Sequence, residues 1–315
     1  MNPVTHFSVP LWTLLFFSAL LKVVPTQTID TECNGTEILS TSQMTQITTM
    51  TTTFSLFLNI SNCTLYIGNP VNGTTTDLIP GAVYPVYLNC TNCSKQLSSL
   101  TKNPATVTGL NITEITTSSL SLSWTKPVGN SSFYKVQWTD DIVSGSLNVS
   151  ATSTTITNLT AGVRYYINVS AVADDKVTEG QPSSVFQYTK PAVVVNLTVS
   201  ITASSVFLSW TQPVGNTLFY TVQSTDGSLN MNLNTTQTYV NITGLTPGGQ
   251  YTFTVRAVAG DQETIGEANA VSLYTKPAVV VNLTVTEFTT SSVFLNWTQP
   301  VGNFFSIKSS GLMQV

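Results

Sequence analysis

The sequence predicts an all-β chain built from tandem antiparallel β-sandwiches. A tryptophan-centred segment recurs at Trp124, Trp210 and Trp297, with spacings of 86 and 87 residues, which is the length of one small domain. Within each period, apolar and polar residues alternate along short segments that are separated by Pro, Gly and Asn turns. No convincing helical pattern follows the N-terminal apolar run, so strands are expected throughout.

The composition excludes several classes of function. The chain has 315 residues, a formal net charge of −4 and only 8% charged residues, so it offers no basic face for a nucleic acid. Its hydrophobic fraction of 42% is too high for a disordered chain. Ser, Thr and Asn must therefore supply most of the surface, and attached sugar would help to keep such a surface soluble.

The N-terminus predicts entry into the secretory pathway. Residues 10–21 form an apolar run of signal-peptide length, and we expect residues 1–28 to be the signal peptide. An uncleaved membrane anchor is the alternative, although the run is shorter than the ~20 residues of a span and Lys22 interrupts it. No later segment is apolar enough to cross a bilayer, so we expect a secreted or extracellular chain with no transmembrane span beyond the signal.

Residues 29–103 are expected to form a divergent, cysteine-containing β module. The segment contains a Leu-Ile-Pro-Gly-Ala-Val-Tyr motif that ends at Tyr84 and is followed by alternating apolar residues. It lacks the tryptophan of the later repeats, because Gln43 occupies the position that the spacing assigns to it. This departure makes the segment the least regular member of the array.

All four cysteines lie in this divergent module. In a secreted chain they predict two disulfides among Cys33, Cys63, Cys90 and Cys93, with three possible pairings. The alternative is a redox or metal site at Cys90-x-x-Cys93. That alternative is disfavoured because the adjacent Asn89 and Asn92 are glycosylation acceptors and no second Cys pair is present.

Two complete modules follow, at residues 104–191 and 192–277. Each contains an alternating strand that ends in its tryptophan and a Leu-x-x-Gly-x-x-Tyr motif that leads into a later strand. The tyrosines, Tyr165 and Tyr251, each lie 41 residues after the tryptophan of the same module. This motif predicts a tyrosine corner, in which the hydroxyl bonds back to the preceding backbone while the ring is buried.

These landmarks resemble fibronectin type III modules, in which a Trp-x-x-Pro segment and the Leu-x-x-Gly-x-x-Tyr corner recur at a constant separation. The resemblance covers residues 104–303 and implies immunoglobulin-like antiparallel sandwiches. It also implies a structural core at Trp124, Trp210, Trp297, Tyr84, Tyr165 and Tyr251. The style of the repeats is similar to that of receptor-type protein tyrosine phosphatases of the class with a single catalytic domain.

The last segment, residues 278–315, is expected to be a truncated module of the same type. It repeats the first two strands and reaches Trp297, but it has no counterpart of the corner tyrosine or of the later strands. Two strands cannot close a sandwich, and their open edge would favour aggregation. We therefore expect residues after about 278 not to fold stably on their own.

Sixteen Asn-x-Ser/Thr acceptors are spread along the chain. Several lie between two apolar residues of a predicted strand. If the apolar side chains point into the core, the asparagine between them points to solvent, because successive side chains lie on opposite faces of a strand. We expect glycans on sheet faces as well as on loops. The acceptors are Asn34, Asn59, Asn62, Asn72, Asn89, Asn92, Asn111, Asn130, Asn148, Asn158, Asn168, Asn196, Asn234, Asn241, Asn282 and Asn296.

The residues give no support for catalysis, and we expect no cofactor and no metal. The only histidine, His6, lies in the predicted signal, so no Ser/His or Cys/His nucleophile is expected. No cysteine has the phosphate-cradling loop and arginine of a phosphatase. The loops at Asp174 and Gly260 lack the Arg of an Arg-Gly-Asp motif, and the Trp-Ser-x-Trp-Ser motif of class I cytokine receptors is missing.

The expected function is therefore recognition or adhesion outside the cell. The favoured hypothesis is an extracellular, glycosylated segment of a cell-surface receptor that resembles a receptor-type tyrosine phosphatase, on the outer side of the plasma membrane. A secreted matrix or adhesion protein of the same modules is the alternative. The expected partner is an extracellular protein or glycan.

Overall fold

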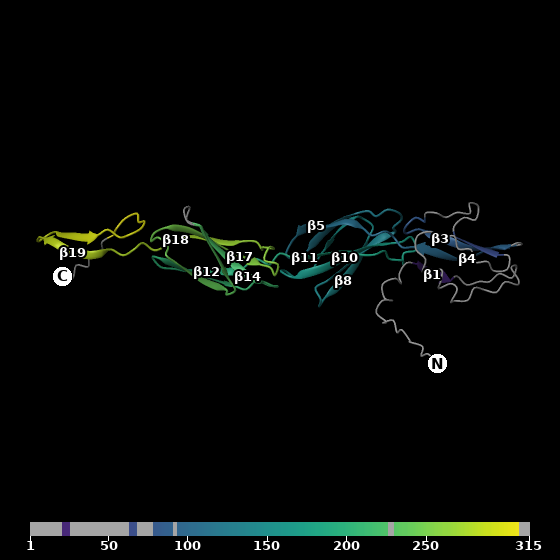
Figure 1. Ribbon diagram of the computed structural model, residues 1–315. Helices are drawn as coiled ribbons and strands as arrows, with labels where there is room; N and C mark the ends of the chain where they lie inside the picture. Colours follow the sequence, from purple (N-terminus) through teal and green to yellow (C-terminus); the bar gives the residue numbers. More distant parts are fainter. Residues whose placement is uncertain (1–20, 26–62, 68–77, 91–92, 226–229, 309–315) are drawn as a thin grey trace, which may run out of the picture. The chain divides into compact units, whose positions relative to one another are not determined.

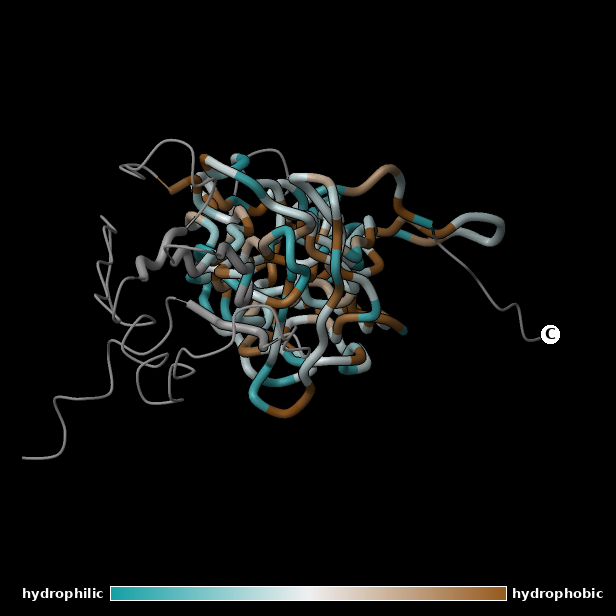
Figure 2. Tube along the Cα trace, turned by 90° about the vertical axis from the view of Figure 1, so that its right-hand side faces the viewer, coloured by the Kyte–Doolittle hydropathy of each residue, from teal (hydrophilic) through white to brown (hydrophobic). Residues whose placement is uncertain are grey.

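The computed structural model describes residues 21–25, 63–67, 78–90, 93–225 and 230–308, and every regular element in these ranges is a β-strand (Figure 1). Hydrophobic and hydrophilic residues interchange at short intervals along the chain trace (Figure 2). The sheet pairings are antiparallel, so the predicted all-β fold class is confirmed. In these ranges no helix is long and apolar enough to cross a membrane.

The N-terminal sheet has four strands in the order β1-β4-β3-β2. Its strands are β1 (Leu21–Pro25), β2 (Cys63–Ile67), β3 (Val83–Cys90) and β4 (Cys93–Lys102). Strand β1 pairs with β4 and lies inside residues 1–28, the expected signal peptide. Cleavage after residue 28 would therefore remove β1 from this sheet.

Module 1, defined here as β5 to β11, contains two sheets. One sheet has the order β5-β6-β9, from β5 (Thr108–Ile115), β6 (Leu120–Thr125) and β9 (Ser153–Ile156). The other has the order β11-β10-β7-β8, from β7 (Phe133–Thr139), β8 (Ser144–Val149), β10 (Arg164–Val172) and β11 (Ser183–Tyr188). Trp124 of β6 contacts Tyr134 of β7, with ring centroids 5.3 Å apart.

Module 2, defined here as β12 to β18, repeats this topology. The sheet β12-β13-β16 is formed by β12 (Val195–Ile201), β13 (Ser205–Thr211) and β16 (Tyr239–Thr243). The sheet β15-β14-β17-β18 is formed by β14 (Phe219–Thr225), β15 (Asn230–Thr235), β17 (Gln250–Val258) and β18 (Asn269–Tyr274).

The core of module 2 lies between these two sheets. Alternate residues of β13 and β17 point inward, and Phe253, Val255 and Leu208 are completely buried there. Trp210 packs edge-on against Tyr220, with ring centroids 5.2 Å apart. Because large apolar side chains contribute most to the free energy of burial, this cluster is the main source of the module's stability.

The chain also separates into two compact units. One contains Met1–Thr113, Leu122–Thr154 and Tyr166–Phe186, and the other contains Glu114–Ser121, Thr155–Tyr165 and Gln187–Val315.

The last two strands, β19 (Val281–Phe288) and β20 (Val293–Thr298), pair only with each other in the described residues. Val206 and Leu208 of module 2 are 0% exposed, whereas their counterparts Val293 and Leu295 are 60% and 41% exposed. The difference arises because no second sheet covers β19 and β20 in the described part of the chain, so this hairpin gains little from burial.

We predict that limited proteolysis with chymotrypsin cleaves residues 278–308 first. Phe288 and Phe294 are exposed on a two-stranded sheet that can open at little cost in free energy. Phe207 is also exposed, at 41%, but it belongs to a complete module and should resist cleavage as an internal control. A tail that survives as long as module 2 would contradict this prediction.

Candidate recognition surface

The loops of each module are held by a buried tyrosine hydroxyl. Tyr165 Oη accepts a hydrogen bond from Thr160 N at 2.9 Å, and Tyr251 Oη accepts one from Thr246 N at 2.8 Å. In the N-terminal sheet, Tyr84 accepts one from the backbone nitrogen five residues earlier, at 2.7 Å. The bond satisfies the polar end of a ring whose remainder is buried, and it fixes the preceding Leu-x-x-Gly turn.

A threonine hydroxyl closes the same turn from the other side. Thr189 Oγ1 donates to Thr160 O at 2.6 Å and accepts from Val163 N at 3.1 Å. Thr275 makes the equivalent pair of bonds in module 2, at 2.6 and 3.0 Å. In the sequence, both threonines begin a recurring Thr-Lys-Pro segment, but the repeat alone predicts no role for them. Their partners lie 26 to 29 residues away, so only the folded chain brings them together.

Each of these turns also contacts a turn of the following repeat. The contact is a backbone hydrogen bond from an asparagine N–H to the carbonyl of the residue before the turn glycine. The bonds are Asn130 N to Pro80 O at 2.8 Å, Asn216 N to Ala161 O at 2.9 Å, and Asn303 N to Pro247 O at 2.8 Å. The first lies within one compact unit and the other two within the second.

Glycine is required on both sides of these contacts. Gly162 has φ +69°, and a Cβ atom there would overlap the carbonyl oxygen of Asn216. Gly215 has φ +93°, and a Cβ atom there would overlap the carbonyl oxygen of Ala161. The same two overlaps recur downstream: a Cβ atom at Gly248 would overlap the carbonyl oxygen of Asn303, and one at Gly302 would overlap that of Pro247. The recurring Val-Gly-Asn and Leu-x-x-Gly motifs therefore meet as a close approach of two backbones.

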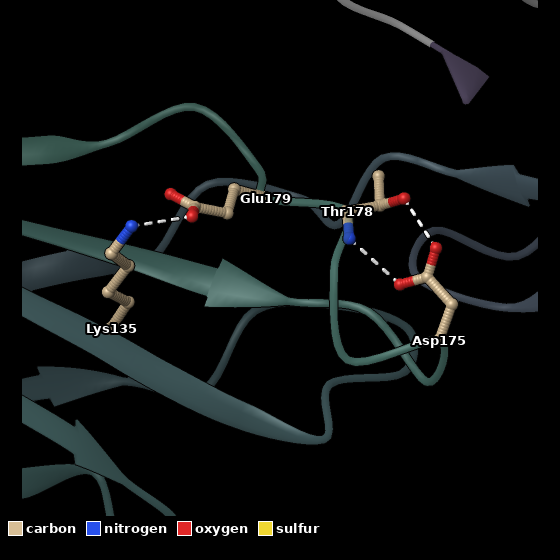
Figure 3. A network of polar contacts seen from close by, with 4 residues as sticks. All are labelled: Lys135, Asp175, Thr178 and Glu179. Carbon is tan, nitrogen blue, oxygen red and sulfur yellow. Dashed lines mark hydrogen bonds and ion pairs between the residues drawn. The ribbon is translucent and has the colours of Figure 1, made fainter.

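The loop after β10 is ordered by an aspartate. Asp175 Oδ1 accepts from Thr178 N at 2.8 Å, and its Oδ2 accepts from Thr178 Oγ1 (Figure 3). Asp175 Oδ1 also accepts from Val177 N at 3.0 Å. Lys135 Nζ forms an ion pair with Glu179 at 2.7 Å beside this loop (Figure 3). This loop is therefore a defined turn in which the carboxylate satisfies the turn's own donors.

Asp261 has the same role in module 2. It accepts from Glu263 N at 3.2 Å, from Thr264 N at 2.9 Å and from Thr264 Oγ1 at 2.6 Å. Burial alone raises the pKa of Asp261, but the hydrogen bonds from Thr264 and Glu263 outweigh it and lower the pKa below the ordinary 3.8. In the described part of the chain, no cluster of three His, Cys, Asp or Glu side chains could hold a metal ion.

The structure places the described glycosylation acceptors at the surface. Asn111, Asn130, Asn148, Asn158, Asn168, Asn196, Asn234, Asn241, Asn282 and Asn296 all have exposed side chains. Asn89 lies on β3, and its side chain is outside the description. Asn34, Asn59, Asn62, Asn72 and Asn92 lie outside the described residues. Glycosylation of any of these remains a prediction.

The cysteine positions are described only through the backbone. Cys90 lies opposite Cys63 in the β2–β3 register and opposite Cys93 in the β3–β4 register. Cys33 lies outside the described residues. The two disulfides therefore stay a prediction, with all three pairings open.

The structural tryptophans differ between the complete modules and the tail. Trp124 and Trp210 are 6% and 5% exposed. Trp297 is only half-buried, because its hairpin has no opposing sheet in the described residues. The same residue type therefore packs in a core only where the rest of the module is present.

The two complete modules match a known domain family. The model of the fibronectin type III domain matches residues 105–187 and 190–272, which is more than half of the chain. Receptor-type tyrosine-protein phosphatase eta of Gallus gallus is 36% identical over 233 residues, covering 70% of this chain and 16% of that protein.

Two other relatives are a second receptor-type phosphatase and a tenascin. Receptor-type tyrosine-protein phosphatase H of Homo sapiens is 30% identical over 246 residues, or 73% of this chain and 21% of that protein. Tenascin-R of Mus musculus is 28% identical over 251 residues, or 76% of this chain and 18% of that protein. The chain thus spans about a fifth of the length of the relatives that it matches.

We predict that Gly162→Ala accelerates hydrogen exchange of the Asn216 amide by roughly tenfold or more, because the methyl group would break its bond to Ala161. Gly244→Ala is the matched control, since Gly244 also has a positive φ of +78° but has open space around its Cβ position. Equal exchange rates in the two variants would contradict a steric requirement at the contact.

We also predict that the contribution of Asp261 to the stability of module 2 is complete above about pH 4 and is lost at lower pH. A carboxylate with a lowered folded pKa contributes stability above its unfolded pKa and loses it as the pH falls through the folded pKa. Asp261→Asn should therefore lower stability at pH 7 by about 1 kcal/mol and reduce the loss on acidification. The measurement is the thermal unfolding temperature at a series of pH values from 7 to 2, with the exposed Glu263→Gln as the control variant. If the unfolding temperature of Asp261→Asn falls with pH in the same way as that of the parent, Asp261 does not have this role.

Proposed function

Because the chain belongs to the fibronectin type III family, we propose that it is an extracellular recognition and adhesion segment of a cell-surface receptor of the receptor-type tyrosine phosphatase kind. Fibronectin type III domains are non-catalytic modules. In this proposal, any phosphatase activity belongs to another part of the parent protein, and these modules supply binding and spacing.

The observation that carries the proposal is the 36% identity with a receptor-type phosphatase over 70% of the chain. A second receptor-type phosphatase, phosphatase H, matches 73% of the chain. The apolar N-terminal run, the cysteines confined to one module and the many glycosylation acceptors all agree with an extracellular position.

The geometry supports recognition through loops. The turns after β10 and β17 are ordered by Asp175 and Asp261, so they present their backbones in a fixed conformation. A loop that is already ordered loses less conformational entropy on binding, which favours affinity. Our proposed partner is an extracellular protein or glycan that contacts such loops or the polar sheet faces.

The second candidate function is a secreted matrix or adhesion protein. The observation that favours it is the 28% identity with tenascin-R over 76% of the chain. In this alternative the same modules would act as spacers and adhesive surfaces in the matrix, with no phosphatase attached.

Antibodies against residues 104–277 would test the proposal on the endogenous protein. We predict that the protein is labelled by a membrane-impermeant biotin reagent, needs detergent for extraction, and co-precipitates with vanadate-sensitive tyrosine phosphatase activity. Recovery from detergent-free matrix extracts without phosphatase activity would favour the matrix alternative. Exclusive recovery from the cytosol would overturn both candidates. N-terminal sequencing of the same material would give the signal cleavage position.

A further inference from the structure

Two aromatic side chains lie together on the outer face of module 2. Phe207 of β13 is 41% exposed and Tyr239 of β16 is 51% exposed, and their rings stack with centroids 5.9 Å apart and planes inclined by 26°. Neither belongs to the buried cluster between the sheets. Such exposed apolar area costs free energy in water unless something covers it.

A glycosylation acceptor lies next to this pair. Asn241 is directly opposite Phe207 in the β13–β16 register. Tyr239 precedes Asn241 by two positions on the same strand, so both side chains point to the same face. Directly opposite residues have Cβ atoms about 5 Å apart, and alternate residues along a strand are about 7 Å apart. A group attached to the Asn241 amide therefore starts within reach of both rings.

A similar group, a Tyr–Phe pair with an acceptor two positions after the tyrosine, occurs in module 1. Tyr166 and Phe186 are 37% and 62% exposed, with ring centroids 6.3 Å apart, and Asn168 follows Tyr166 by two positions on β10. Asn168 Oδ1 accepts from Ser184 Oγ at 2.7 Å, a bond that uses only the amide oxygen. A shallow hollow of about 450 Å³, lined in part by Tyr166 and Asn168, lies beside the acceptor.

The sequence carries this spacing at further acceptors. An aromatic residue two positions before the asparagine also occurs at Phe57 and Asn59, at Tyr87 and Asn89, and at Phe294 and Asn296. Other acceptors lack it; Asn234 in module 2, for example, is preceded at that position by Asn232. Core packing does not explain the recurrence, because Tyr166 and Tyr239 occupy exposed positions that alternate with buried ones along their strands.

We propose that Asn168 and Asn241 carry N-linked glycans whose first N-acetylglucosamine packs against the adjacent Tyr–Phe pair. One face of a pyranose ring presents C–H groups, which match the electron-rich face of an aromatic ring, and the contact removes apolar area from water. Each pair is thereby an intramolecular binding site for the chain's own sugar, and the glycan stabilises the sheet that carries it.

The sugar is a better occupant than another protein. The acceptor asparagine lies within the patch, so a glycan there would hold a flat protein surface away from the rings. Two rings also form a much smaller area than the roughly 800 Å² per partner of a stable protein interface. The inference rests on entry into the secretory pathway, which the proposed function also requires.

The test uses the full chain secreted from mammalian cells that attach only high-mannose glycans, trimmed with endoglycosidase H to one N-acetylglucosamine per site. We expect Asn241→Gln to lower the melting temperature by about 4 °C in the parent and by under about 1 °C in a Tyr239→Ser background. Asn234→Gln is the matched control, and its effect should not depend on Tyr239. Ring-current shifts of the sugar protons at Asn241 in proton NMR give a readout that needs no variant.

The possible outcomes separate this inference from the proposed function. Glycopeptide mass spectrometry that finds sugar at Asn234 but none at Asn168 and Asn241 would overturn the inference alone. The inference would also be overturned if sugar is present at Asn241, the effect of Asn241→Gln on the melting temperature is the same with and without Tyr239, and the sugar protons show no ring-current shift. A chain without sugar at any acceptor would count against both the inference and the extracellular assignment.

Discussion

The bond between a buried tyrosine hydroxyl and the backbone of its own preceding turn is the constraint on which the modules depend. Tyr165 and Tyr251 place their rings in the core, and the hydroxyls reach Thr160 N and Thr246 N. The turn so fixed supplies the carbonyl that accepts from the next repeat. A single side chain thus couples core packing to loop position, because a buried hydroxyl left without a partner would cost about 1–3 kcal/mol.

Around this constraint the complete modules and the tail behave differently. Where both sheets are present, tryptophan and aliphatic side chains are almost fully buried, as at Trp210 and Leu208. The hairpin β19–β20 has a closely similar sequence, yet all its apolar residues except the half-buried Trp297 are exposed in the described chain. Local sequence therefore suffices to pair two strands, whereas a core requires the second sheet.

The surface follows from the low charge of the chain. With 8% charged residues, solubility must come from Ser, Thr and Asn and, in our proposal, from glycans. The loops that could recognise a partner are ordered by short-range bonds of Asp175 and Asp261 within the turn. In our proposal, the ordered loops are available for binding, while the sugars cover exposed aromatic residues on the sheet faces.

The sequence by itself determined the all-β class, the repeat length and the tryptophan and tyrosine positions, because alternation and spacing are one-dimensional signals of strand burial. The tertiary structure decided what joins distant positions: Thr189 closing a turn 29 residues earlier, Gly162 meeting Asn216, and Phe207 lying opposite Asn241. These relations depend on strand register and on the approach of separate turns, neither of which leaves a periodic trace along the chain.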